Sequence, residues 1–258
     1  MKKALFVLAV LAPSILFAQS PFDGTWKTIF DQSKISPKPI KFSLNNGMYD
    51  AFSTVPEIHV KADGQDQPVS EQPFDTVAVT EVNANTVQFV YKKNGKTIRE
   101  TGATVSDDGK TLTYKVKSYP SASDQVITTE VTLDRVGEAP AGANATSGSW
   151  RVQKLSASDN DLLETYKLTG DELTYSTPTG ETWTGKFDGT DYPVKGSYSI
   201  DTVSLKQINP QKIQLSFKRG GKLIEVNKIT ISPDGKKMTA VDKSELTGRV
   251  STYVSEKQ

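Results

Sequence analysis

Cysteine is absent from the 258 residues, and histidine occurs once, as His59. Without cysteine the chain has no disulfide, no thiolate metal ligand and no cysteine nucleophile. A single histidine excludes a multi-histidine metal site and leaves one candidate for a Ser-His-Asp arrangement. His59 lies in a stretch with the pattern of a strand, and no Gly-x-Ser-x-Gly motif occurs. We therefore expect an ordinary strand residue, no catalytic residues, no bound metal and no cofactor.

The chain also lacks an excess of either charge, because it has 31 Lys and Arg residues and 30 Asp and Glu residues. Sequence-independent nucleic-acid binding needs a basic surface, so no nucleic-acid partner is expected. Two Asp-Gly-x-Asp segments begin at Asp63 and Asp188, but neither has the closing Glu of a calcium loop, so both predict turns. The acidic residues are too scattered for the sequence to single out a pair for glycoside hydrolysis.

The one long apolar run extends from Ala4 to Ala18 and follows Met1-Lys2-Lys3. A short basic region before such a run predicts a signal peptide, residues 1–18, with cleavage after Ala18. A retained N-terminal anchor is the alternative, although the run is shorter than the roughly 20 residues of a membrane helix. No cysteine follows that could carry a lipid. These features predict a periplasmic or secreted protein without a membrane span.

The rest of the chain contains one sequence plan twice. Gly24-Thr-Trp26 recurs as Gly148-Ser-Trp150, and the segment from Asp75 to Lys115 matches residues 201–241 without a gap, at about fifteen identical positions. The period is far longer than that of a solenoid repeat, so each copy should be a domain. We expect one domain over 22–136, a second over 148–258, and a flexible linker over the small and polar residues 137–149.

Each copy alternates apolar and polar residues with period two, as in Val87, Phe89 and Tyr91. Turn signals separate these stretches, and Asn94-Gly95 is typical of a two-residue hairpin. No sustained helical period appears. About seven to nine short strands per copy, joined by tight turns, predict an all-β protein of two tandem antiparallel up-and-down barrels. A pair of β-sandwiches is the alternative.

The Gly-x-Trp at the first strand of each copy, followed by a β-meander, resembles the lipocalin-like (calycin) barrels, including uncharacterised secreted bacterial proteins of that type. The resemblance implies that Trp26 and Trp150 plug the closed floor of a barrel. It also implies that a basic residue near the last strand packs across each indole, and Arg135 and Lys257 are the matching positions. The copies are shorter than a typical lipocalin and have neither its frequent disulfide nor its C-terminal helix.

What the resemblance implies about function is a non-enzymatic protein that binds a small apolar or amphipathic molecule. Trp183 and Phe187 alternate with Gly185 on one strand face, and a glycine beside large aromatics can leave space for a ligand wall. The first copy has no matching tryptophan, which makes Trp183, together with Phe187, a candidate ligand contact, and ordinary core packing is the alternative. A structural or protein-interaction module of the cell envelope, with an unknown partner, is one alternative, and a hydrolase is another.

Overall fold

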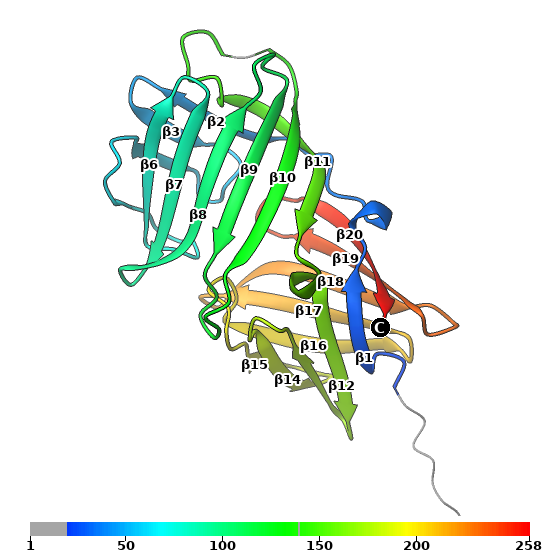
Figure 1. Cartoon of the computed structure of the whole chain (residues 1–258). Helices are drawn as coiled ribbons and strands as arrows, with labels where there is room; N and C mark the ends of the chain where they lie inside the picture. The colour runs from blue at the N-terminus through cyan, green and yellow to red at the C-terminus, as the bar shows by residue number, and fades with distance from the viewer. Residues whose placement is uncertain (1–19, 139) are drawn as a thin grey trace, which may run out of the picture.

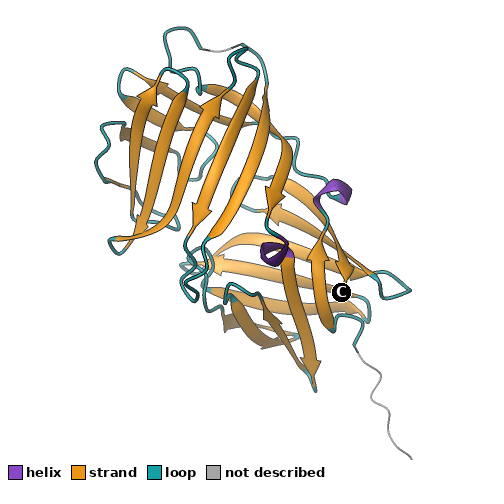
Figure 2. Ribbon diagram, in the orientation of Figure 1, coloured by secondary structure: helices purple, strands orange, loops and turns teal. Residues whose placement is uncertain are grey.

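The computed structural model describes residues 20–138 and 140–258, so the predicted signal peptide lies outside the described residues. The described residues form twenty β-strands and two short 3-10 helices, η1 (Phe30–Gln32) and η2 (Asp159–Leu162). Figure 2 shows that strands dominate the whole molecule. In the described part of the chain, neither of the helices reaches the length and apolarity needed to cross a membrane.

The strands form where the sequence alternates. On β7 (Thr86–Lys93), Val87 and Phe89 are buried while Gln88 is exposed. The turn that follows β7 has positive φ angles at both central residues, 50° at Asn94 and 75° at Gly95, as a type I′ hairpin requires. The predicted hairpin and its alternating strands are therefore present.

The strands assemble into two ten-stranded antiparallel sheets, each curved into a nearly closed barrel. The prediction of two tandem barrels rather than sandwiches is confirmed. The first barrel consists of the following ten strands, in chain order: β2 (Ile40–Asn45), β3 (Met48–Ala51), β4 (Ile58–Lys61), β5 (Gln67–Pro68), β6 (Thr76–Asn83), β7, β8 (Lys96–Val105), β9 (Thr111–Ser118), β10 (Ile127–Arg135) and β11 (Gly148–Ala157).

The second barrel consists of the strand that begins the described chain and the nine that end it. These are β1 (Gly24–Thr28), β12 (Leu163–Thr169), β13 (Glu172–Ser176), β14 (Thr182–Lys186), β15 (Asp188–Pro193), β16 (Thr202–Asn209), β17 (Lys212–Arg219), β18 (Lys222–Ile231), β19 (Lys237–Ser244) and β20 (Val250–Lys257). Figure 1 shows β1 beside β12 and near the C-terminus, far from β2 in the other barrel.

The two repeats have thus exchanged their first strands. β1 pairs with β12 and β20, and β11, its counterpart in the second repeat, pairs with β2 and β10. Both strands carry the same Gly-x-Trp pattern, so each fits the slot that the other leaves. Two segments connect the barrels, one from β1 to β2 through η1 and one from β11 to β12 through η2.

This pairing differs from the expectation of contiguous domains over 22–136 and 148–258, because each barrel takes one strand from the other repeat. The segment expected to be a flexible linker between domains, residues 137–149, also has a different place in the structure. Residues 137–149 join β10 to β11 within the first barrel, and Thr146 and Ser147 are fully buried. The Ser147 hydroxyl receives a hydrogen bond from the Leu44 N–H at 2.7 Å. The later part of the segment, residues 143–147, thus packs against the barrel, whereas residues 140–142 are exposed.

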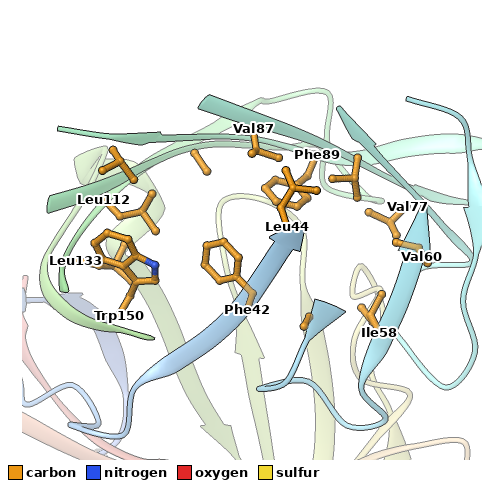
Figure 3. Close-up of a cluster of buried hydrophobic side chains, with 14 of the residues drawn as sticks. Phe42, Leu44, Ile58, Val60, Val77, Val87, Phe89, Leu112, Leu133 and Trp150 are labelled. Atoms are coloured by element: carbon orange, nitrogen blue, oxygen red, sulfur yellow. The ribbon is translucent and has the colours of Figure 1, made fainter. Parts of the chain in front are cut away.

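Each barrel has its own hydrophobic core. Figure 3 shows the first, in which Trp150 of β11 lies beside Leu133 of β10 and near Phe42 of β2. The second core contains Trp26 of β1 among residues of β12–β20. The exchanged strands therefore bury their tryptophans in the barrel that they join.

The two barrels meet at their mouths, which we define as the ends opposite these tryptophans. Lys222, the first residue of β18, pairs with Glu71 of the first barrel at 2.7 Å. Tyr198 of the second barrel packs against the core of the first. Figure 1 shows the connection between β9 and β10 reaching the second barrel at this junction. A cavity that opens at the mouth of one barrel therefore lies next to the mouth of the other barrel.

Candidate functional site

The floor of the second barrel is formed by Trp26 and Lys257. Trp26 is fully buried, and its indole N–H donates to the Phe22 carbonyl at 2.9 Å. The Lys257 Nζ lies 5.3 Å from the centre of the indole ring. Gly24 has a φ of +132°, and a Cβ there would lie 2.6 Å from the Lys257 side chain. The glycine of Gly-x-Trp thus makes room for the basic residue.

The floor of the first barrel repeats this arrangement with Trp150 and Arg135. The Arg135 Cζ lies 4.0 Å from the ring centre. The guanidinium also donates to the carbonyls of Gly109 at 2.6 Å, Ala145 at 2.6 Å and Ser147 at 2.8 Å. Burial lowers the pKa of Arg135 from its ordinary value. These contacts close the barrel ends and leave no space for a ligand beside the indoles.

The third tryptophan, Trp183 on β14, lines an internal cavity of the second barrel, whereas Phe187 only packs against the core. The space over Gly185 is filled, because a Cβ there would lie 2.6 Å from the Tyr192 ring and 2.9 Å from Leu205. The expectation that this glycine opens a ligand wall is therefore wrong. The cavity lies on the other side of Trp183, toward the mouth.

This cavity has a volume of about 320 Å³, within the range of small-molecule sites. One wall is aromatic: the Tyr175 and Trp183 rings stack at 5.3 Å with an angle of 12° between them, and Tyr166 lies 5.2 Å from Tyr175. The crossing segments contribute Phe30 and Asp161, so the cavity reaches the mouth of the barrel.

The remaining walls are acidic. Among the described residues, five carboxylates line the cavity and no Lys, Arg or His does; the five are Asp161, Glu164, Glu181, Glu225 and Asp242. We call this space the acidic cavity. Each of the five side chains is only half-buried, because the cavity itself leaves part of its surface accessible.

Burial raises the pKa of Glu164 to about 7, although the Tyr166 hydroxyl, at 3.2 Å, and the Ser255 hydroxyl donate to its carboxylate. Burial also raises the pKa of Asp242 to about 7, and the nearby charges of Glu225 and Glu164 add to the effect. The pKa values of Glu225 and Glu181 are raised chiefly by burial too. Carboxyl groups that are buried together without a basic partner keep their protons up to a higher pH than exposed ones.

Several oxygen atoms in the wall have no partner. The Oδ1 atoms of Asp161, Asn227 and Asp242 are shielded from solvent and accept no hydrogen bond from any described residue. Burying a polar atom without a partner costs roughly 1–3 kcal/mol. Within the described ranges, no three acidic or histidine side chains converge closely enough to hold a metal ion. The oxygens are instead spread around the cavity, where an extended donor could reach them.

The first barrel lacks this acidic lining. Corresponding strand registers place Arg99 where the second barrel has Glu225, because each pairs with an aromatic residue on the preceding strand. The same comparison places Val116 where Asp242 stands and Ile40 where Glu164 stands. The duplicated fold does not need the acids, which makes a role specific to the second barrel the better explanation.

Sequence reasoning missed these acids although the signal was present. Asp242 continues the inward alternation of Met238 and Ala240 on β19, and Glu225 and Asn227 precede the buried Ile229 on β18. A carboxylate in the core phase of a strand is unusual. That pattern marks each acid singly, but it does not show that acids from β12, β18 and β19 share one cavity.

Two of the larger hollows have no comparable excess of one charge. One, of about 590 Å³, lies over β7–β10 and mixes Lys115 and Lys117 with Glu100 and Glu130. The other, of about 710 Å³, lies at the junction of the barrels and includes the ion pair of Lys222 with Glu71. Their charges are of both signs, so the acidic cavity remains the strongest candidate site.

Comparison of the chain with protein-family models, with curated proteins and with solved structures finds no match. The fold and the cavity define the class: two nearly closed antiparallel β-barrels in tandem, with a polar cavity in one of them.

Proposed function

We propose that this protein is an exported, lipocalin-like binding protein whose second barrel takes a small amphipathic cation. The single observation that carries the proposal is the acidic cavity, lined by five carboxylates and no basic side chain. A ligand ammonium supplies the missing positive charge and hydrogen-bond donors. The stacked Tyr175 and Trp183 rings suit the apolar part of such a ligand and can also contact its cation.

The test compares three probes with one ring and one chain length: 2-phenylethylamine, 2-phenylethanol and phenylacetate. Isothermal titration at pH 8 should give binding of the amine at least about tenfold tighter than the alcohol, since a charge-assisted hydrogen bond contributes about 1.5–3 kcal/mol. Phenylacetate should bind weakest, because its charge repels the carboxylates. Equal binding of amine and alcohol would contradict the proposal.

Variants locate the site. The double change Glu164→Gln and Asp242→Asn should remove most of the preference for the amine, because it removes two charges from the wall. The matched control is Glu172→Gln, an exposed acid on β13 that does not line the cavity. If none of the probes binds the folded protein, a structural or interaction module of the envelope becomes the better explanation.

A hydrolase is the second candidate, favoured by one observation. Glu164 and Asp242 have pKa values near 7 beside stacked aromatic rings, and glycoside hydrolases combine a protonated and an ionised carboxyl group beside the bound sugar. Nitrophenyl glycosides report such activity directly. Under the binding proposal they are not cleaved, and turnover lost in Glu164→Gln would favour the hydrolase instead.

A further inference from the structure

The cavity at the junction of the two barrels contains a basic group with no counter-ion. Arg99 of β8 lies with its Cζ 4.0 Å from the centre of the Tyr91 ring. Its Nε is shielded from solvent and has no hydrogen-bond partner, and Arg99 forms no ion pair with any described residue. The Arg99 guanidinium therefore has no anionic partner within ion-pair distance among the described residues.

Both barrels contribute to the space that Arg99 lines. This junction cavity measures about 350 Å³ and includes Phe74 and Tyr91 from the first barrel and Ser197 and Glu181 from the second. It is therefore formed only when the two mouths meet. Hydroxyl groups around it, such as that of Ser199, can donate to an anion that Arg99 holds.

Glu181 stands at the boundary between this space and the acidic cavity, since it lines both. A molecule long enough to extend past Glu181 would therefore have Arg99 at one end and the carboxylates of the acidic cavity at the other. The charge at one position of the duplicated fold has reversed between the barrels, with Arg99 in the first and Glu225 in the second. At this position the mouth of the first barrel therefore carries a basic residue and the mouth of the second an acidic one.

We propose that the ligand is an elongated zwitterion, with its ammonium in the acidic cavity and its carboxylate on Arg99. This inference rests on the proposed function for the cationic end and adds the anionic end. A ligand confined to one cavity would pair either Arg99 or the carboxylates. One molecule with a charge at each end pairs Arg99 and the carboxylates together. The aromatic walls of both cavities suit an apolar spacer between the charges.

The experiment compares straight-chain amines, from hexylamine to dodecylamine, with amino acids of the same chain lengths that carry a carboxylate at the far end. Titration at pH 8 should show at least one amino acid binding about tenfold or more tighter than the amine of equal length. Simple carboxylates of the same lengths should bind more weakly than either.

Arg99→Leu should bring the best amino acid to the affinity of its matching amine or below, and should leave the amine unchanged or slightly tighter. Arg99→Gln is the second variant, and the melting temperature of each establishes that it is folded. Lys115→Gln is the matched control, because Lys115 is exposed on the outer face of β9. That variant should bind like the unmodified protein.

The outcomes separate the two proposals. If neither amines nor amino acids bind, the proposed function fails. If amines bind but no amino acid exceeds its matching amine, the proposed function stands and the zwitterion inference fails. If Arg99→Leu leaves the advantage of the amino acid intact, Arg99 does not hold the carboxylate, and the inference is overturned as well.

Discussion

At the residue scale, the acidic cavity combines groups that are unfavourable together in the empty protein. Burial raises the pKa values of Glu164, Glu225 and Asp242, and the charges of Glu225 and Glu164 raise the pKa of Asp242 further. Among the described residues, no basic side chain lines the same space. Proteins commonly place such uncompensated groups at binding sites. A bound cation would remove the conflict, so ligand binding and stability should be linked through these side chains.

The pH dependence of stability provides the first prediction. The pKa values of Glu164 and Asp242 rise to about 7 in the folded protein, from ordinary values of 4.5 and 3.8. Between these values the folded protein binds protons that the unfolded chain has lost, so the contribution of both groups to stability falls as the pH rises from about 4 to about 7 and stays low above that.

The ligand-free double variant Glu164→Gln, Asp242→Asn should therefore melt at a higher temperature than the unmodified protein at pH 8. The two proteins should melt at similar temperatures near pH 3, where both acids are protonated in the folded and in the unfolded chain. Calorimetry at the two pH values measures the difference. A melting difference that does not change with pH would show that the two acids do not titrate as inferred.

The floor residues provide a second prediction, because the two cations differ in their partners. Arg135 donates to three backbone carbonyls besides covering Trp150, whereas Lys257 covers Trp26 from 5.3 Å. Arg135→Ala should cost about 2–4 kcal/mol of unfolding free energy, since it leaves buried carbonyls unpaired. Lys257→Ala should cost about 1 kcal/mol or less. Urea denaturation measures both, and equal costs would contradict the assigned contacts.

Trp150 itself provides a third prediction. Its side chain is fully buried in the first core, and its N–H donates to Thr146 at 2.8 Å. Trp150→Ala should destabilise the protein by about 3–5 kcal/mol through the cavity that it leaves. An unchanged melting temperature would show that the indole does not support the fold.

At the element scale, the exchange of β1 and β11 is the main departure from a simple tandem repeat. Each strand makes the same kind of contacts in its adopted barrel, with its tryptophan under a basic residue of the last strand. Exchange between equal slots of this kind costs little, as in domain swapping between identical chains. Here both partners belong to one chain.

The absence of cysteine makes the exchange directly testable, and this is the fourth prediction. In the structure Lys27 of β1 pairs with Glu256 of β20. If β1 occupied its own repeat, the register of β11 would place Lys27 opposite Asp134 instead, because Arg151 pairs with Asp134. Lys27→Cys with Glu256→Cys should therefore form a disulfide on oxidation, and Lys27→Cys with Asp134→Cys should not.

All three of these side chains lie at least partly exposed, so the matched pairs differ little in their effect on folding. Mass spectrometry of the oxidised monomers counts the cross-links. Efficient cross-linking only of the pair with Asp134 would mean that each repeat keeps its own first strand.

At the scale of the whole molecule, the exchange interlocks the two barrels. A cut after Gly142 divides the chain into a fragment that holds β1–β10 and a fragment that holds β11–β20. Each barrel then needs strands from both fragments, β11 in the first barrel and β1 in the second.

The fifth prediction follows from this interlock. A protease site inserted after Gly142 should yield two fragments that still elute together at the size of the intact protein, and separate only in denaturant. The loop there is exposed, so cleavage itself is accessible. Two fragments that separate without denaturant would indicate independent barrels built from contiguous repeats.

Local sequence alone determined much of this architecture. Period-two alternation and turns such as Asn94-Gly95 define strands within a few residues, so the all-β class and the barrels could be predicted. Gly-x-Trp and the resemblance to lipocalin-like barrels also pointed to the floor residues, but within each repeat, whereas the structure places Lys257 over Trp26 and Arg135 over Trp150. These signals are readable because one short segment carries each of them.

Only the tertiary structure decided which repeat each first strand joins and which acids share a cavity. Gly24-Thr-Trp26 and Gly148-Ser-Trp150 suit either slot equally well, so their local sequences cannot distinguish the exchanged from the unexchanged pairing. Glu164, Glu225 and Asp242 lie on separate strands, and barrel closure alone brings them around one space. Both outcomes depend on strand register across long stretches of chain, which local propensity does not encode.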